Sequence, residues 1–500
     1  MSGALERLRG ALGEVDDLRR AAFVLQWDLE TYLPPGGVQD RAVQLATLQR
    51  LAHQRLVSGE MERLLEAAEA EVHSLDYDSD EASLVRVTRR DRELTARLPA
   101  ELVAEVAEAG ARARPVWREA RARSDWSLFE PCLRTSVELG RRIAEATGYE
   151  ARPYDALLEW TEPGLTTAEV EKLFAELKEA IVPLVRRVSE RADLVAEDVL
   201  DRPLDAERQL AFSLQLIRRL GFDIQRGRQD LSAHPFCISF GPGDVRITTR
   251  VGRGLRDSSL LASVHESGHA MYNQGIPRRL ARTPLWAGAS PGVHESQSRL
   301  WENLVGRSRA FWTYLTPELQ SAFPELADVD ADELYRAVNR VKPSYVRVDA
   351  DELTYNLHIL LRFEIENELH EGRLSVEDIP QAWNARLERY LGLPAPEAAL
   401  GPLQDIHWSG PVAGGFVGYT LGNLISVQLM EAARVRLPDL DEQLAQGEFA
   451  ALLGWLREHV HVHGRKFTPN ELLERATGGP ISSGPWISYA RTKFGALYGL

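Results

Sequence analysis

The amino-acid sequence predicts a mainly α-helical protein that carries one small β-hairpin or sheet. Three observations support this fold class: helical periodicity over the first 230 residues, a short β-branched and aromatic stretch at residues 234–250, and helical periodicity again up to the C-terminus. No flexible linker or internal repeat divides the 500 residues, so we expect one continuous domain over residues 1–500.

The first 230 residues are rich in Ala, Glu, Leu and Arg, and their apolar positions recur at spacings of three and four. Charged residues lie on the opposite faces, which is the pattern of long amphipathic helices. Proline and glycine interrupt this pattern at residues 34–37 and 163–164. Two of the periodic runs are Leu102, Val103, Val106 and Ala107, and Leu173, Leu177, Ile181 and Leu184.

The stretch at residues 234–250 has a different pattern. His-Pro-Phe-Cys-Ile-Ser-Phe precedes Gly241-Pro242-Gly243, and Asp-Val-Arg-Ile-Thr-Thr-Arg follows it. Two strand-forming runs around a Gly-Pro-Gly turn predict a β-hairpin. We expect His234 and Asp244 to shape this hairpin rather than to take part in chemistry.

Charge and cysteine content exclude several classes of partner. Lys and Arg number 59 and Asp and Glu number 74, so the formal net charge is 59 − 74 = −15. An acidic protein lacks the counter-charge that binding to nucleic acid or to an anionic membrane requires. Cys132 and Cys237 are too few for a disulfide framework, and we interpret both as small buried hydrophobic residues.

The N-terminal residues run into charged positions without an apolar signal core. No stretch of the chain approaches the roughly 18–20 uncharged apolar residues of a membrane span. We therefore expect a soluble, reduced, cytoplasmic protein.

Residues 265–269 read His-Glu-Ser-Gly-His. On a helix, positions four apart lie about 40° apart around the axis and about 6 Å along it, so both imidazoles can bind one ion. Asp257-Ser258-Ser259 offers N-cap side chains, and Gly275 with Pro277 marks the end of the predicted helix. The alternative is a pair of surface histidines one turn apart on an ordinary helix.

Glu266 lies about 100° around the same helix from His265, where it can hydrogen-bond a metal-bound water. Neutral imidazole is a good ligand for zinc, and the ion lowers the pKa of such a water towards about 7. The pattern therefore predicts a zinc site in which Glu266 activates the attacking water.

A catalytic zinc site needs a third protein ligand and an open position for water. Downstream of His269, the sequence Val293-His294-Glu295-Ser296-Gln297 begins a second helical pattern that runs through Trp301. We predict that Glu295, at the head of this helix, is the third ligand. Alone, a glutamate at a helix start is usually a solvated charge. The upstream pair of histidines favours a metal ligand here.

Six motifs in order resemble those of the carboxypeptidase Taq family of thermostable-type metallocarboxypeptidases, and the resemblance covers nearly the whole chain. Trp27-Asp28 with residues 34–37 also resembles the opening helices of that family. The six motifs are His234-Pro235-Phe236, Asp244-Val245-Arg246-Ile247-Thr248, His265–His269, His294-Glu295-Ser296-Gln297, Val346-Arg347-Val348-Asp349-Ala350-Asp351, and Gly401-Pro402-Leu403-Gln404-Asp405-Ile406-His407-Trp408.

The resemblance implies a mostly helical, saddle-shaped enzyme with a deep central groove, usually a homodimer. The implied activity removes single residues from peptide C-termini with broad side-chain tolerance. The implied cofactor is one zinc ion per chain, or sometimes cobalt, held by His265, His269 and Glu295, with Glu266 as the general base.

A carboxypeptidase must bind the terminal carboxylate of its substrate. A guanidinium does so bidentately and never loses its charge. We predict Arg347 for this role, with Arg246 as the second candidate. The alternatives are an ion pair of Arg347 with Asp349 or Asp351, and an exposed strand position for Arg246.

His407 and Tyr419 are candidates to donate hydrogen bonds to the oxyanion that forms when water attacks the carbonyl. Without the resemblance we would interpret His407 as packed against Trp408 and Tyr419 as a core aromatic. Residues 414–419 depart from the family pattern Gly-Tyr-Phe-Pro-Thr-Tyr, because Gly415 lacks the tyrosine and Val417 lacks the proline. We expect this departure to affect rate and substrate preference and to leave the metal chemistry intact.

Two other functions fit parts of the sequence. An oligopeptidase of the related two-histidine-plus-glutamate type would cut inside short peptides, but Arg347 and the Asp-x-Arg-x-Thr hairpin favour the exopeptidase. A metal-binding protein without catalytic activity would not need Glu266, and the presence of this residue argues against that interpretation.

Overall fold

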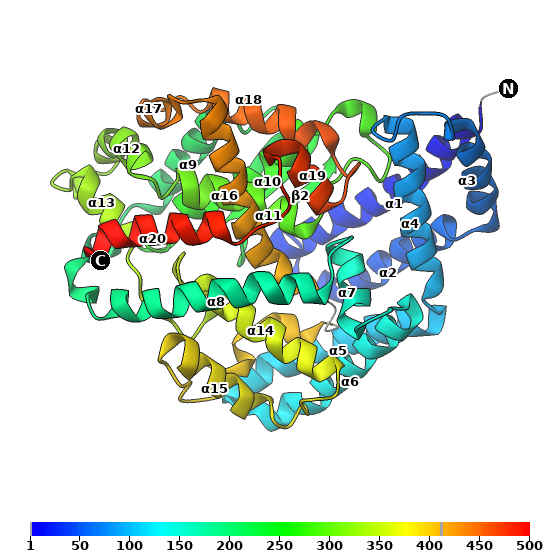
Figure 1. The fold of residues 1–500 in the computed structure, drawn as a ribbon, viewed down its shortest axis with the longest axis horizontal. Coiled ribbons are helices and arrows are strands. Elements are labelled where there is room, and N and C mark those ends of the chain that lie inside the picture. Colours follow the sequence, from blue (N-terminus) through cyan, green and yellow to red (C-terminus); the bar gives the residue numbers. More distant parts are fainter. Residues whose placement is uncertain (1–2, 411–413) are drawn as a thin grey trace. The chain divides into compact units, whose positions relative to one another are not determined.

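The computed structural model describes residues 3–410 and 414–500, and the chain divides into two compact units. Unit 1 comprises Met1–Ala96, Glu197–Val338 and Ser426–Pro480, and unit 2 comprises Arg97–Ala196, Asn339–Ile425 and Ile481–Leu500. Both units are mainly helical (Figure 1), which confirms the predicted fold class. That residues 1–500 act as one domain with a central groove remains a prediction.

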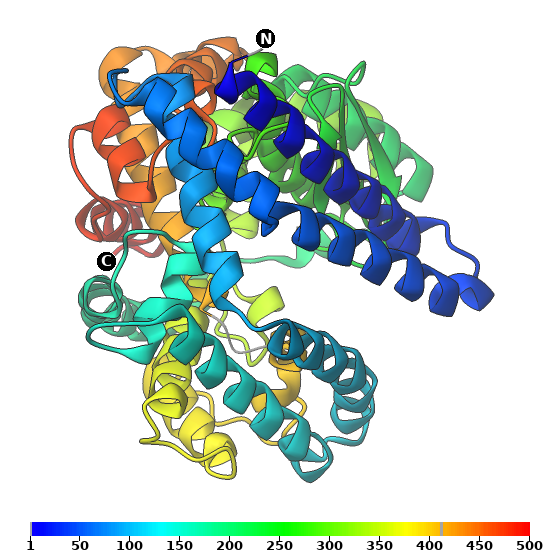
Figure 2. The same cartoon turned by 90° about the vertical axis from the view of Figure 1, so that its right-hand side faces the viewer.

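Unit 1 consists of a helical hairpin, two further N-terminal helices, and a group of helices around a small sheet. The hairpin is formed by α1 and α2, the two long blue helices that lie side by side in Figure 2. The helices of unit 1 are α1 (Ala4–Thr31), α2 (Val38–Leu56), α3 (Gly59–Val72), α4 (Asp80–Arg97), α9 (Ala206–Leu220), α10 (Ser259–Gly275), α11 (Pro291–Arg299), α12 (Arg309–Ala322), α13 (Ala331–Val338), α17 (Leu440–Ala445), α18 (Ala450–His459) and α19 (Pro469–Thr477).

The sheet of unit 1 has three strands in the order β1-β3-β2, namely β1 (Gly227–Leu231), β2 (Cys237–Gly241) and β3 (Asp244–Thr249). β2 pairs antiparallel with β3, which confirms the predicted hairpin. β1 pairs parallel with β3 and was not predicted, because its sequence Gly-Arg-Gln-Asp-Leu lacks a strand-forming pattern. β3 packs against α10, and its Val245 and Ile247 are fully buried.

Unit 2 contains helices and no strand among its described residues. α5 packs along α6, and α14 is buried on almost all sides. α16 (Gly418–Arg436) begins in unit 2, and its C-terminal part belongs to unit 1. The other helices of unit 2 are α5 (Ala100–Arg123), α6 (Trp126–Thr147), α7 (Pro153–Thr161), α8 (Thr167–Ser189), α14 (Tyr355–His370), α15 (Ile379–Leu391) and α20 (Gly484–Tyr498).

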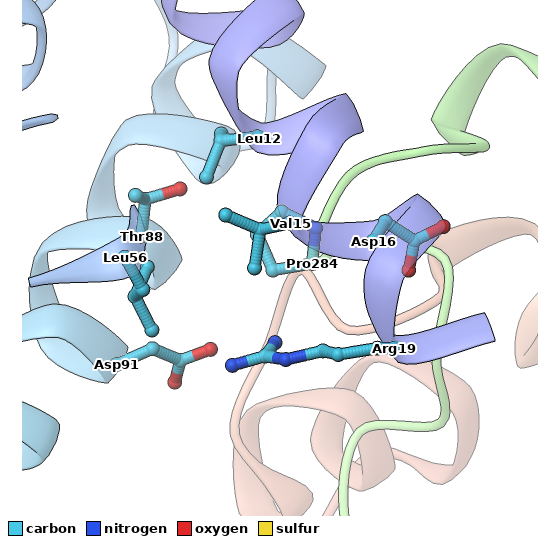
Figure 3. Close-up of a pocket in the computed structure, with 8 residues that line it drawn as sticks. All are labelled: Leu12, Val15, Asp16, Arg19, Leu56, Thr88, Asp91 and Pro284. Carbon is cyan, nitrogen blue, oxygen red and sulfur yellow. The ribbon is translucent and has the colours of Figure 1, made fainter. Parts of the chain in front are cut away.

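A small cavity of unit 1 is lined by residues of α1, α2 and α4 (Figure 3). Its volume is about 30 Å³, which is room for about one water. Arg19 points across it towards Asp91, whose carboxylate is bound by Arg465 with one contact at 2.9 Å. This cavity is too small for a peptide, and none of the predicted site residues lines it.

Candidate metal site

The two predicted histidine ligands lie on α10, which begins and ends where the sequence indicates. The Ser258 hydroxyl caps the N-terminus by accepting from the Leu260 amide at 3.2 Å. The helix runs to Gly275 and stops before Pro277. One turn apart, the rings of His265 and His269 have their centroids 5.1 Å from each other.

The third predicted ligand, Glu295, lies on α11, which packs directly against α10. Close packing is possible because residue 268 is glycine: a Cβ atom there would lie 2.6 Å from the carbonyl oxygen of Gln297. α11 begins at Pro291 with Ser290 as its N-cap. Glu295 is therefore in the middle of this nine-residue helix rather than at its head.

The three predicted ligands present their donor atoms to one point. Glu295 Oε2 lies 3.4 Å from His269 Nε2 and 3.9 Å from His265 Nε2. One donor atom from each residue lies within 4.8 Å of the others, and among the described residues this is the one such cluster of His, Cys, Asp or Glu. Two imidazole nitrogens and a carboxylate oxygen at this spacing are a suitable donor set for a divalent metal ion.

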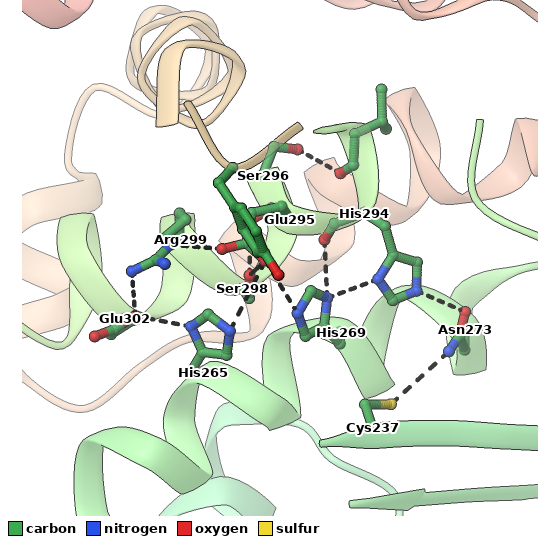
Figure 4. Close-up of polar contacts among 12 residues, drawn as sticks. Cys237, His265, His269, Asn273, His294, Glu295, Ser296, Ser298, Arg299 and Glu302 are labelled. Carbon is green, nitrogen blue, oxygen red and sulfur yellow. Dashed lines mark hydrogen bonds and ion pairs between the residues drawn. The ribbon is translucent and has the colours of Figure 1, made fainter. Parts of the chain in front are cut away.

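Glu302 orients His265. The Nδ1 atom of His265 hydrogen-bonds Glu302 Oε2 at 2.8 Å (Figure 4), so this nitrogen carries the proton and the Nε2 lone pair is available to a metal. Burial alone would lower the pKa of His265, but the hydrogen bond to Glu302 and the charge of Glu295 outweigh it and raise the pKa.

A chain of side chains orients His269 in the same way. Burial holds the pKa of His294 well below its ordinary value, so this imidazole is neutral. Its Nε2 donates to Asn273 Oδ1 at 3.1 Å, and its Nδ1 therefore accepts from His269 Nδ1 at 2.6 Å. The His269 Nδ1 atom is also 3.0 Å from the His294 carbonyl oxygen. The Nε2 lone pair of His269 is thus left for a metal.

The amide of Asn273 is in turn oriented by Cys237, to whose sulfur Nδ2 donates at 3.9 Å (Figure 4). Cys132 and Cys237 are both free thiols of intermediate exposure, so neither is as fully buried as predicted. Cys237 starts β2 beside the site, where its sulfur accepts a hydrogen bond.

Two arginines hold the carboxylates of the site in their charged form. Arg299 Nε binds Glu295 Oε1 at 2.7 Å, and its Nη1 binds Glu302 Oε2 at 3.2 Å. Arg307 binds the other oxygen of Glu302 at 3.3 Å. Burial would raise the pKa of both glutamates, but Arg299 and the neighbouring histidines outweigh it and lower both values.

The candidate base, Glu266, is 6% exposed and follows His265 on α10. Burial raises the pKa of its carboxyl group above the ordinary value, and the charges of Glu295 and Glu302 add to this effect against the opposing effect of the histidines. A carboxylate with a raised pKa is a stronger base than a solvated one, which suits it to accept a proton near neutral pH.

Arg246, the second candidate for substrate binding, lies on β3 in unit 1. Its Nε and Nη2 bind the two carboxylate oxygens of Asp244 at 2.9 and 2.8 Å, and its guanidinium carbon lies 4.4 Å from the centroid of the Trp27 ring. The side chain is 20% exposed. Arg246 is therefore partly buried, and the two N–H groups with which it could bind a carboxylate bidentately already bind Asp244.

Arg347, His407 and Tyr419 lie together in unit 2. Arg347 Nε binds Asp405 Oδ2 at 2.7 Å and its Nη1 donates to the Tyr355 hydroxyl at 2.9 Å. The predicted alternative, an ion pair with Asp349 or Asp351, was wrong about the partner. Asp351 instead caps its own loop by accepting from Thr354.

The His407 ring bridges Asp405 and Tyr419. Its Nδ1 lies 2.5 Å from Asp405 Oδ1, and its Nε2 lies 3.2 Å from the Tyr419 hydroxyl. The His407 side chain is 41% exposed, whereas that of Asp405 is 4% exposed. A ligand can therefore reach the imidazole but not the carboxylate behind it.

The structure thus brings His265, Glu266, His269 and Glu295 together in unit 1, and Arg347, His407 and Tyr419 together in unit 2. Glu302 was not predicted from the sequence. It lies seven residues after Glu295, and this spacing indicates that both residues lie on one face of a helix. Asp405 belongs to a motif that was recognised, but no role was predicted for it.

One protein family and several known proteins match this chain over nearly its whole length. The family described as carboxypeptidase Taq (M32) metallopeptidase matches residues 7–494. The chain is 42% identical over 483 residues to thermostable carboxypeptidase 1 of Thermus thermophilus, covering 95% of this chain and 94% of that one. It is 37% identical over 488 residues to carboxypeptidase 1 of Bacillus subtilis, covering 97% of each chain.

Solved structures of carboxypeptidases have a fold similar to that of this chain. The M32 carboxypeptidase of Deinococcus radiodurans superposes with a TM-score of 0.96 at 44% identity, covering 99% of this chain and 100% of that one. The carboxypeptidase of Pyrococcus furiosus superposes with a TM-score of 0.95 at 36% identity, covering 99% of both chains. No helix among the described residues is long and apolar enough to cross a membrane.

Proposed function

The chain belongs to the carboxypeptidase Taq (M32) metallopeptidase family and is a metallocarboxypeptidase, and we propose that it removes single residues from peptide C-termini with broad side-chain tolerance. The observation that carries this proposal is the convergence of His265 Nε2, His269 Nε2 and Glu295 Oε2, with the buried Glu266 beside them.

We propose that the metal is zinc, one ion per chain, with cobalt as the alternative. Both Nδ1 atoms are hydrogen-bonded, so each histidine offers its Nε2 atom, and two imidazoles with one carboxylate are a donor set found in catalytic zinc sites. Cobalt accepts the same donors. When bound, such an ion polarises a carbonyl group and lowers the pKa of a water.

Glu266 performs the proton transfers in this proposal. Its carboxylate accepts a proton from the water that attacks the scissile carbonyl carbon, and the proton then passes to the nitrogen of the leaving residue. The C–N bond breaks, and the elements of one water are divided between the two products. Proton transfer by a positioned side chain is typically worth about 10²–10⁴-fold in rate.

Three further residues recognise the substrate and stabilise charge in this proposal. Arg347 binds the terminal carboxylate through N–H groups that Asp405 and Tyr355 do not use, and this contact selects the last peptide bond. His407 and Tyr419 donate hydrogen bonds to the developing oxyanion. Arg246 is the second candidate for the carboxylate, although Asp244 already occupies its bidentate face.

We also propose that the enzyme is a cytoplasmic homodimer. Support for the dimer is the family resemblance, and support for a reducing compartment is that Cys132 and Cys237 are both free thiols. Light scattering of the purified protein tests the first proposal, and fractionation of the source cells tests the second.

The activity is tested by incubating the purified protein with zinc or cobalt and an N-terminally blocked peptide, and by following the products by mass. We expect a ladder of products, each shorter by one C-terminal residue. Internal fragments would identify an oligopeptidase, and an unchanged peptide would identify a metal-binding protein without catalytic activity.

A further inference from the structure

Asp405 contacts two residues to which the proposed function gives different tasks. Its Oδ2 binds Arg347 Nε at 2.7 Å, and its Oδ1 lies 2.5 Å from His407 Nδ1. One buried carboxylate therefore holds both the residue that would bind the substrate carboxylate and a residue that would stabilise the oxyanion.

The chain around Asp405 is built to fix its position. Asp405 connects two short 3₁₀ turns, Pro402–Gln404 and Ile406–Ser409, and its Oδ1 also accepts from the His407 amide at 3.1 Å. Trp117 Nε1 donates to the Leu403 carbonyl at 3.1 Å and so attaches this segment to α5.

Gln404 fixes the other side of the contact. Its Oε1 accepts from the Arg347 amide at 2.7 Å, and its Nε2 donates to the Tyr345 carbonyl at 2.9 Å. Adjacent residues thus hold the backbone and the side chain of Arg347, and the guanidinium cannot turn without breaking a buried ion pair.

The contacts of Asp405 determine which hydrogen-bonding groups remain for a ligand. In Arg347, Asp405 takes the Nε–H and Tyr355 takes one N–H of Nη1, so three of the five guanidinium N–H groups make no hydrogen bond to the described residues. In His407, the hydrogen bond at Nδ1 leaves Nε2 directed towards Tyr419, on a side chain that is 41% exposed. Because Asp405 holds Nδ1, the ring keeps one orientation, and Nε2 is the nitrogen left for a ligand.

We propose that Asp405 is a positioning residue that couples recognition of the substrate's terminal carboxylate, through Arg347, to stabilisation of the oxyanion, through His407. This inference rests on the proposed roles of those two residues. Burial alone would raise the pKa of Asp405, but the hydrogen bond to His407 and the charge of Arg347 outweigh it and hold the pKa well below its usual value. Asp405 is thus charged at every pH at which the enzyme would work.

The test is Asp405→Asn, which keeps the shape of the side chain and removes its charge. Each enzyme is assayed on a peptide with a free C-terminus and on the same peptide with a C-terminal amide. We expect the acid-to-amide ratio of kcat/KM to fall towards one, and kcat on the acid to fall about tenfold or more. Metal content and Tm are measured on the same samples. The matched control is Asp349→Asn, an exposed neighbour of Arg347, which should leave the ratio and kcat unchanged.

Double variants separate coupling from general damage. In an Arg347→Ala background, Asp405→Asn should not lower the acid-to-amide ratio further, and in a His407→Ala background it should not lower kcat further. Additive losses in both backgrounds would overturn the proposal, because they would show that Asp405 acts independently of both partners.

Different results would contradict the proposed role of Arg347 and the proposed role of Asp405. If wild type hydrolyses acid and amide equally, the role of Arg347 is wrong. If wild type prefers the acid and Arg347→Ala loses this preference, but Asp405→Asn keeps both the preference and kcat, only the inference is overturned. Should the Asn variant not fold, Asp405→Glu is assayed in the same way. It keeps the charge but shifts the carboxylate by one methylene, and the same losses are expected. Wild-type values in that variant would overturn the proposal.

Discussion

The backbone of Gly268 packs against the carbonyl oxygen of Gln297, at a place where an added Cβ atom would lie 2.6 Å from that oxygen. Gly268 belongs to the helix that carries both histidines, and Gln297 belongs to the helix that carries Glu295. The absence of one side chain therefore sets the separation of the helices that hold the three donor atoms.

Gly268→Ala should weaken metal binding although it changes no ligand. The new methyl group pushes α11 away from α10 and moves Glu295 out of reach of the histidines, so we expect metal affinity to fall about tenfold or more. Calorimetric titration of the metal-free protein with zinc measures this. The control is Gly454→Ala on α18, where a Cβ meets no atom of the described residues within 4 Å and should stabilise the helix by about 1 kcal/mol. Equal zinc affinities in wild type and Gly268→Ala would show that helix separation does not set the site.

Glu302→Gln should lower zinc affinity about 10–100-fold, which is the typical effect of removing a partner that orients a ligand. The amide can still accept a hydrogen bond from His265 Nδ1, but it no longer increases the basicity of the ring or pairs with Arg299 and Arg307. Competition with a zinc-binding dye gives the dissociation constant. Glu325→Gln, an exposed change in unit 1, is the control. An unchanged dissociation constant in Glu302→Gln would exclude this role.

The stability of the protein should fall as the pH is lowered below about 6.5. Burial lowers the pKa of His461 to about 3, whereas an unfolded histidine titrates near 6.5. Between these values the unfolded state binds more protons than the folded state. The contribution of this residue therefore lowers the free energy of unfolding by about 1.4 kcal/mol for each unit by which the pH falls. In His461→Gln, which keeps a polar partner for Gln297, the plot of Tm against pH should be shallower over this range. An identical slope would show that His461 does not contribute.

His407→Ala should act on kcat rather than on KM. A donor directed at the developing oxyanion is used in the transition state and little before it, so its loss should cost roughly 10²-fold in kcat. Steady-state kinetics on a short peptide measure both constants. Normal kcat with a raised KM would instead indicate a binding or packing role.

The helical class, the hairpin and the ligand cluster could be predicted because each depends on short sequence spacing. A separation of four residues places His265 and His269 on one face of a helix regardless of what surrounds it. The parallel pairing of β1 with β3 was missed because it joins segments that are not neighbours in the sequence and β1 is mostly polar. The hydrogen-bonding partner of each ring could not be predicted either.

The partner of Arg347 in unit 2 was also missed, because the two residues are far apart in the sequence. The alternative to its predicted role was an ion pair with one of the nearest acids, Asp349 or Asp351, yet the structure pairs it with Asp405, 58 residues away. Spacing in the sequence does not predict which distant turn packs against a loop. A buried guanidinium pairs with whichever carboxylate the fold brings next to it. Likewise, α11 continues into a π-helix at Leu300–Val305 that carries Glu302, and the sequence pattern did not indicate this change of helix type.

The most direct test of the account is to measure metal content and peptidase turnover on the same preparation of Glu266→Gln, with His269→Ala beside it. The amide keeps the shape of Glu266 but cannot accept the proton of the attacking water. We predict one metal ion per chain in Glu266→Gln, with turnover reduced about 10²–10⁴-fold, and neither metal nor turnover in His269→Ala. Wild-type turnover in Glu266→Gln, or a full equivalent of metal in His269→Ala, would contradict the assignment of the base or of the ligands.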